Sequence, residues 1–120
     1  MLPVAHRLRR PAQFTAVLRN RRAGRSGSDL LVVHAAHVPR PAGISPVPRV
    51  GFVVSKAVGN SVIRSRTARV LRHLVAQELP VIPVDVDVVV RAGPALPAAT
   101  SQRVRVALHA QLRDAISRAR

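Results

Sequence analysis

The sequence predicts one α+β domain over residues 1–120, in which a small sheet packs on helices. The first observation is that apolar residues recur at helical spacing in some segments and form short valine-rich runs in others. The second is the order of these segments, α-β-β-α-β-α, with no internal repeat. The third is that 48% of the residues are hydrophobic, which lets a chain of 120 residues bury a core.

Helical spacing marks three segments. Pro11 suits the first turn of a helix that ends near Leu18. A second helix is expected over 62–77, before Pro80, and its core side is expected to hold Ile63, Thr67, Val70, Leu71 and Leu74. A third helix starts with Thr100 or Ser101 as N-cap, and its buried stripe is expected to hold Val104, Leu108, Leu112, Ala115 and Ala119.

Strands are expected over 30–38, 49–55 and 84–91, with a proline-rich loop between the first two. Asp85 and Asp87 lie two residues apart on the last strand and so share a face, which invites a metal site. No histidine or third carboxylate stands at a suitable spacing, however. We therefore predict no metal site and expect the two carboxylates to lie on the solvent face of an edge strand or to pair with arginine.

The charge indicates a polyanionic partner. Twenty Lys and Arg residues against five acidic ones give a formal charge of +15, and nucleic acid is the first candidate. Every basic residue except Lys56 is Arg, whose planar guanidinium suits phosphate, although a GC-rich coding bias produces the same composition. The absence of Cys excludes disulfides, zinc-thiolate sites and thiol catalysis. With no secretory signal or membrane-spanning run, we expect a cytoplasmic protein without a membrane partner.

The helix expected over 62–77 has a basic side. Arg69 and Arg72 project together, away from the core side, and Arg64 and Arg66 flank them. Four guanidinium groups on one short helix form a surface that can grip adjacent phosphates. The alternative is the solvated face of an arginine-rich protein.

The stretch 49–72 reads RVGFVVSKAVGNSVIRSRTARVLR. It resembles the signature of the bacterial ribonuclease P protein family, in which a strand ending in Val-Ser-Lys passes through Gly-Asn into an arginine-bearing helix. The flanking segments match in order and spacing, so the resemblance covers nearly the whole chain. Ser65 stands where the family has Asn and Ala68 where it has Lys. The first departure removes hydrogen-bonding groups and the second removes one phosphate contact.

Gly59 and Asn60 form the joint between strand and helix. Glycine tolerates positive φ and asparagine can cap a helix, so a structural role is expected for both. A phosphate contact at the helix N-terminus, near Lys56, is a second possible role.

The resemblance implies that the chain is the protein subunit of ribonuclease P, which binds a catalytic RNA and the 5′ leader of precursor tRNA and assists removal of the leader. It implies an RNA-binding set made of Lys56, Asn60, Arg64, Ser65, Arg66, Arg69 and Arg72. It implies a leader-binding cleft containing Phe14, Leu18, His34 and Phe52, although the two Phe residues and His34 also suit ordinary core or strand positions. It also implies a left-handed crossover between the second and third expected strands.

No nucleophile and base pair, carboxylate dyad or metal cluster is visible, so no catalytic residue is expected in this chain. The resemblance implies that the RNA subunit and the substrate hold the Mg²⁺ ions that activate water. It implies ribonuclease P RNA and precursor tRNA as partners and no obligate protein partner. A ribosomal or other structural RNA-binding protein and a nucleoid-type DNA-binding protein remain alternatives, but neither accounts for the motif at 49–72.

Overall fold

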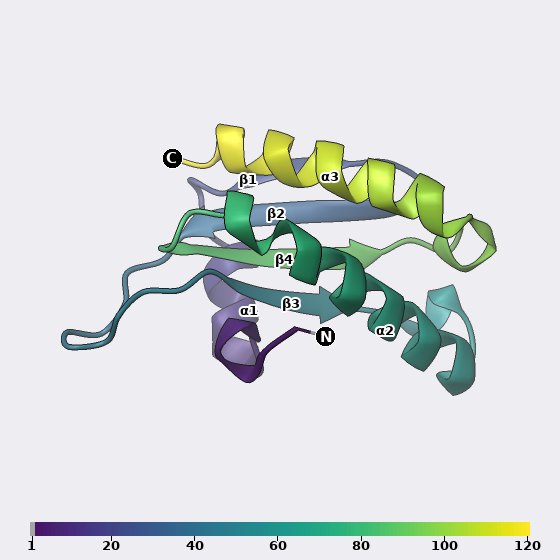
Figure 1. The fold of residues 1–120 in the computed structure, drawn as a ribbon, viewed down its shortest axis with the longest axis horizontal. Coiled ribbons are helices and arrows are strands. Elements are labelled where there is room, and N and C mark those ends of the chain that lie inside the picture. The colour runs from purple at the N-terminus through teal and green to yellow at the C-terminus, as the bar shows by residue number, and fades with distance from the viewer. Residues whose placement is uncertain (1) are drawn as a thin grey trace.

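In the computed structural model, which describes residues 2–120, one mixed four-stranded sheet has the order β1-β2-β4-β3 (Figure 1). The strands are β1 (Gly24–Gly27), β2 (Leu31–His37), β3 (Arg49–Val53) and β4 (Val86–Ala92). The helices are α1 (Pro11–Leu18), α2 (Ser61–Glu78) and α3 (Ser101–Arg118). Every helix and strand expected from the sequence is present, which confirms the α+β fold class and the order of those six elements.

Strand β1 was not expected from the sequence. Its residues, Gly-Arg-Ser-Gly, contain no apolar side chain and hence no alternating pattern. The strand forms because β2 offers it an antiparallel partner, with Gly24 opposite Ala35 and Gly27 opposite Val32. It also packs so closely on α3 that a Cβ on Gly24 would lie 1.8 Å from the carbonyl oxygen of Ala115. Tertiary contacts therefore create a strand that local sequence does not indicate.

Helices α2 and α3 cover one face of the sheet, and α1 lies on the other face (Figure 1). The main core fills the space between the sheet and the two long helices. On α2 the buried residues are Thr67, Leu71, Leu74 and Val75. Val75 was not among the expected core positions, while Ile63 and Val70 are only half-buried. On α3 four of the five expected stripe residues are buried, and Ala119 lies just beyond the helix.

The connection from β3 through α2 to β4 is left-handed. Strands β3 and β4 are parallel neighbours, with Val50 opposite Val88. In Figure 1 α2 lies in front of the sheet, both arrowheads point right, and the chain passes from β3 up to β4. This arrangement has the opposite hand to that of nearly all such connections. It confirms the crossover implied by the family resemblance.

Strand β4 is central, so Asp87 is not on an edge strand and is fully buried. Its carboxylate accepts hydrogen bonds from Arg49 Nε at 2.9 Å and Arg49 Nη2 at 2.6 Å, and from Arg40 Nη2 at 2.8 Å. Arg40 also donates to the carbonyls of Val38 and Val47, which closes the proline-rich loop. The expectation of arginine partners is thus confirmed for Asp87, whereas the half-buried Asp85 accepts from His37 at 2.8 Å.

Candidate nucleic-acid interface

The start of α2 is fixed by the Gly59–Asn60 joint. Gly59 adopts a φ of 155°, and a Cβ there would lie 2.9 Å from the side chain of Ile63. Asn60 is the N-cap, and its side-chain oxygen accepts from the Ile63 N–H at 3.0 Å. These contacts confirm the structural role expected for both residues. Because the cap uses only the oxygen, the exposed amide nitrogen of Asn60 is left to face solvent or a ligand.

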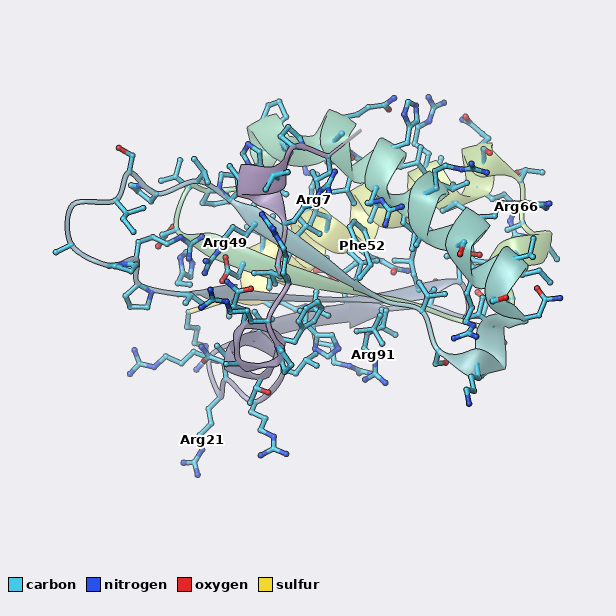
Figure 2. The ribbon with its side chains drawn as sticks, turned by 90° about the horizontal axis from the view of Figure 1, so that it is seen from below. Arg7, Arg21, Arg49, Phe52, Arg66 and Arg91 are labelled. Carbon is cyan, nitrogen blue, oxygen red and sulfur yellow. The ribbon has the colours of Figure 1, made fainter. Side chains whose placement is uncertain are left out.

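The four arginines of α2 divide between two hollows. Arg64 and Arg72, with Ala68 between them, line a groove of about 490 Å³ along the outer edge of β3. Arg66 and Arg69 line a smaller hollow, of about 410 Å³, on the outer side of the helix, and Figure 2 shows Arg66 near the N-terminal end of α2. Ser65 borders both hollows. The basic surface predicted from the sequence therefore exists, but it is wrapped around the helix instead of lying on one side.

The opposite wall of the β3-edge groove is the segment that precedes α1. The Leu8 N–H donates to the Val50 carbonyl at 3.0 Å, so this segment pairs beside β3. Leu8 is buried, and its neighbours Arg7 and Arg9 line the groove. The sequence reasoning did not assign these two arginines to the site. The signal was the alternation Arg-Leu-Arg, which is typical of an extended segment with one buried face.

Two arginines in the groove, Arg7 and Arg64, differ in how their guanidinium groups are held. Arg7 Nε donates to the Leu2 carbonyl at 2.8 Å, which fixes the direction of its guanidinium. Arg64 Nε is buried and has no hydrogen-bond partner within residues 2–120. A buried donor without a partner costs free energy, and a change of rotamer that brings the Arg64 guanidinium to an anion in the groove would recover it.

The two Phe residues reach the groove from opposite faces of the sheet. Phe14 lies over Gly51, where a Cβ would lie 2.5 Å from the ring, on the face that carries α1. Phe52 packs against the main core, on the α2 side of the sheet (Figure 2). Both rings line the groove because β3 is an edge strand and the groove follows that edge. The structure thus brings these two predicted residues together with the arginines.

Leu18 and His34 do not line this groove. Leu18 is 38% exposed at the end of α1. His34 is half-buried on β2, directly opposite Arg25 on β1 and Val89 on β4. Burial, followed by the charges of Arg25 and Arg91, lowers the pKa of His34, so the imidazole is neutral at pH 7. Its Nε2 is buried and has no hydrogen-bond partner among the described residues.

Lys56 is exposed in the short turn between β3 and α2, next to the groove but not among its lining residues. It lies four residues before Asn60, on the approach to the N-terminus of α2. Of the predicted RNA-binding residues, Arg64, Ser65 and Arg72 share the groove, Arg66 and Arg69 occupy the outer hollow, and Lys56 and Asn60 lie at the start of the helix.

Comparison with known proteins identifies the family. A model of the Ribonuclease P family matches residues 2–116. The chain belongs to the ribonuclease P protein family. The ribonuclease P protein component of Streptomyces bikiniensis is 52% identical over 99 residues, which cover 78% of each chain. That of Rhodococcus jostii is 46% identical over 115 residues, which cover 93% of this chain and 90% of the relative.

Solved ribonuclease P proteins share the fold. The Staphylococcus aureus protein superposes with a TM-score of 0.72 at 21% sequence identity, covering 90% of this chain and 93% of the other. The Thermotoga maritima protein gives a TM-score of 0.67 at 24% identity, covering 87% and 92%. The expected fold is thereby confirmed, and the family model with the two relatives confirms the expected family.

Within this ribonuclease P protein, the two departures from the family motif, Ser65 and Ala68, both border the β3-edge groove. Ser65 is exposed and Ala68 is half-buried. A short side chain at each position leaves the space between Arg64 and Arg72 open. The groove therefore relies on guanidinium groups, including Arg7 and Arg9 from the facing wall, for its positive charge.

Proposed function

We propose that this chain, a ribonuclease P protein component, binds the catalytic RNA through α2 and the 5′ leader of precursor tRNA in the β3-edge groove, and so assists endonucleolytic removal of the leader. The observation that carries the proposal is the content of the groove. Both Phe residues of the chain and four arginines, Arg7, Arg9, Arg64 and Arg72, line one hollow. Aromatic rings beside guanidinium groups are typical of sites for single-stranded nucleic acid.

The remaining predicted residues extend these two surfaces. Arg66 and Arg69, on the outer side of α2, together with Lys56 and Asn60 at its start, contact the phosphate backbone of the RNA subunit. Phe14 faces the α1 side of the sheet as well as the groove, so the leader passes over its ring toward His34 and Leu18. Neutral His34 then offers an imidazole face to a base.

Catalysis is proposed to reside in the RNA subunit. Mg²⁺ is then held mainly by that RNA and the substrate, whose phosphates are ligands of the kind that this ion prefers. This chain contributes binding: its arginines neutralise phosphates that would otherwise repel one another when leader and catalytic RNA approach.

The proposed setting is the cytoplasm, with ribonuclease P RNA and precursor tRNA as partners and no obligate protein partner. None of the helices in residues 2–120 combines the length and apolar character that a bilayer-spanning helix requires.

Reconstitution tests the proposal. The protein is mixed with the ribonuclease P RNA of its own organism, and cleavage of precursor tRNA is measured at low Mg²⁺. We expect the protein to stimulate cleavage and to leave precursor tRNA intact when the RNA is omitted. An equally charged basic ribosomal protein serves as the control. Stimulation no greater than that of the control would favour the structural RNA-binding alternative.

A further inference from the structure

A second group of arginines lies on the sheet edge opposite to β3. It consists of Arg22 and Arg25, beside and within β1, and of Arg118 and Arg120, at the end of α3, and is called here the β1-edge cluster. All four residues are exposed. Since β1 and β3 are the outer strands of the sheet, three strand spacings, about 14 Å, separate the cluster from the strand that carries the groove.

Backbone contacts hold the β1-edge cluster in place. The Arg120 N–H donates to the Arg22 carbonyl at 2.8 Å, and Arg118 Nη1 donates to the Arg25 carbonyl at 2.8 Å. Figure 1 shows the C-terminal end of α3 lying along β1. Two segments more than ninety residues apart in the sequence are thereby fixed side by side. The fold itself, and no flexible tail, sets the positions of these arginines.

The cluster carries positive charge that contacts within the fold do not neutralise. Arg118 pairs with the half-buried Asp114 at 3.2 Å. Within residues 2–120 no ion pair or hydrogen bond engages the guanidinium groups of Arg22, Arg25 or Arg120. Four clustered cations that face one carboxylate repel one another, and an added polyanion relieves this repulsion.

We propose that the β1-edge cluster binds the phosphate backbone of duplex RNA, so that the protein contacts two RNA segments at once, one at each edge of the sheet. The inference rests on the proposed function only in taking RNA as the partner. Both Phe residues lie in the groove at the other edge, and the imidazole of His34, opposite Arg25, is half-buried. The cluster therefore presents no exposed aromatic ring of its own on which single strands could stack. Duplex RNA is recognised mainly through its shape, phosphates and 2′-hydroxyl groups, for which exposed guanidinium groups suffice.

Binding of a blunt RNA duplex tests the surface directly. The double variant Arg22→Gln/Arg25→Gln is compared with Arg103→Gln/Arg105→Gln, which removes the same charge from exposed positions at the other end of α3. A plot of log affinity against log salt concentration has a negative slope, and each arginine that contacts a phosphate adds up to about 0.9 to its magnitude. The first variant should therefore reduce the magnitude of this slope by about 1 to 2 and weaken binding about tenfold at roughly 0.1 M salt. Equal effects of the two variants, at unchanged melting temperatures, would overturn the proposal.

A tethered probe locates the contact in the complex with ribonuclease P RNA. Because the chain contains no Cys, Ser117→Cys places a single hydroxyl-radical probe on the exposed surface beside Arg118, and Ser61→Cys places one at the start of α2. We expect the Ser117 probe to cut a base-paired RNA segment that the Ser61 probe does not cut.

The two proposals fail in different ways. Cutting from Ser61→Cys alone would leave the α2 interface intact and overturn the β1-edge surface. Cutting from neither position would count against the proposed function, and the duplex titration would then decide for or against the cluster.

Discussion

Phe14 is the residue at which the leader path and the fold meet, because its ring packs on Gly51 and also lines the β3-edge groove. Phe14→Ala is expected to weaken binding of precursor tRNA with a leader by about 1 to 3 kcal/mol, through loss of base stacking, and to change affinity for mature tRNA much less. Phe14→Leu is the control, since it retains apolar packing but removes the ring. Equal losses for both RNAs, together with a lower melting temperature, would assign Phe14 to packing alone.

His34 gives the chain a pH-dependent contribution to stability. Burial, with Arg25 and Arg91 nearby, lowers its pKa in the folded protein below 6.5, the ordinary value for histidine. The unfolded chain therefore takes up the proton first as the pH falls, so this contribution is complete above about pH 6.5 and decreases below it. The melting temperature of the wild-type protein should fall more between pH 7.5 and pH 5.5 than that of the His34→Asn variant. Equal losses would show that His34 titrates normally.

The pH window of His34 is separate from that of Asp85. The hydrogen bond from His37 lowers the pKa of Asp85 below its usual 3.8. The stability from this carboxylate is present above that value and is lost only in stronger acid. The comparison between pH 7.5 and pH 5.5 therefore reports on histidine.

At the scale of elements, α2 shows which structural features can be predicted from the sequence and which cannot. Periodicity placed the helix to within one residue at each end and identified most of its buried positions. The division of its arginines between groove and outer hollow depends on the edge of β3 and on the segment that carries Arg7 and Arg9. The strand lies only a few residues before α2 and the segment lies far from it in sequence, but the way both pack around the helix is set by tertiary contacts. For the same reason β1, whose four residues form a strand only against β2 and α3, was not predictable from local pattern.

Ala68→Lys tests the groove side of α2. The new ammonium group would enter the space between Arg64 and Arg72, so we expect tighter binding to ribonuclease P RNA at low salt and a salt slope steeper by about 1 or less. The gain should vanish at high salt. Ala110→Lys adds the same charge to an exposed position on α3. If both variants tighten binding equally, the groove offers no advantage over diffuse positive charge.

The whole molecule combines a charge of +15 with few internal ion pairs, and the most buried of these join Arg40 and Arg49 to Asp87. The exposed cations repel one another in the free protein and bind phosphates in the complex, so added salt should act on folding and on binding in opposite directions. Raising NaCl should increase the melting temperature of the free protein by screening this repulsion.

The same salt should weaken RNA binding, with a log-log slope of roughly −3 to −5 if about five phosphates are contacted. Thermal melts and binding titrations over one NaCl series measure both responses. The matched control is Asp114→Asn, which removes a partly exposed carboxylate and should make the increase in melting temperature larger. A melting temperature that falls with salt, while binding weakens as expected, would mean that attraction between surface charges, such as those of Arg118 and Asp114, outweighs the repulsion. The repulsion among the cations of this chain would then not oppose folding of the free protein, and RNA would be needed for function alone.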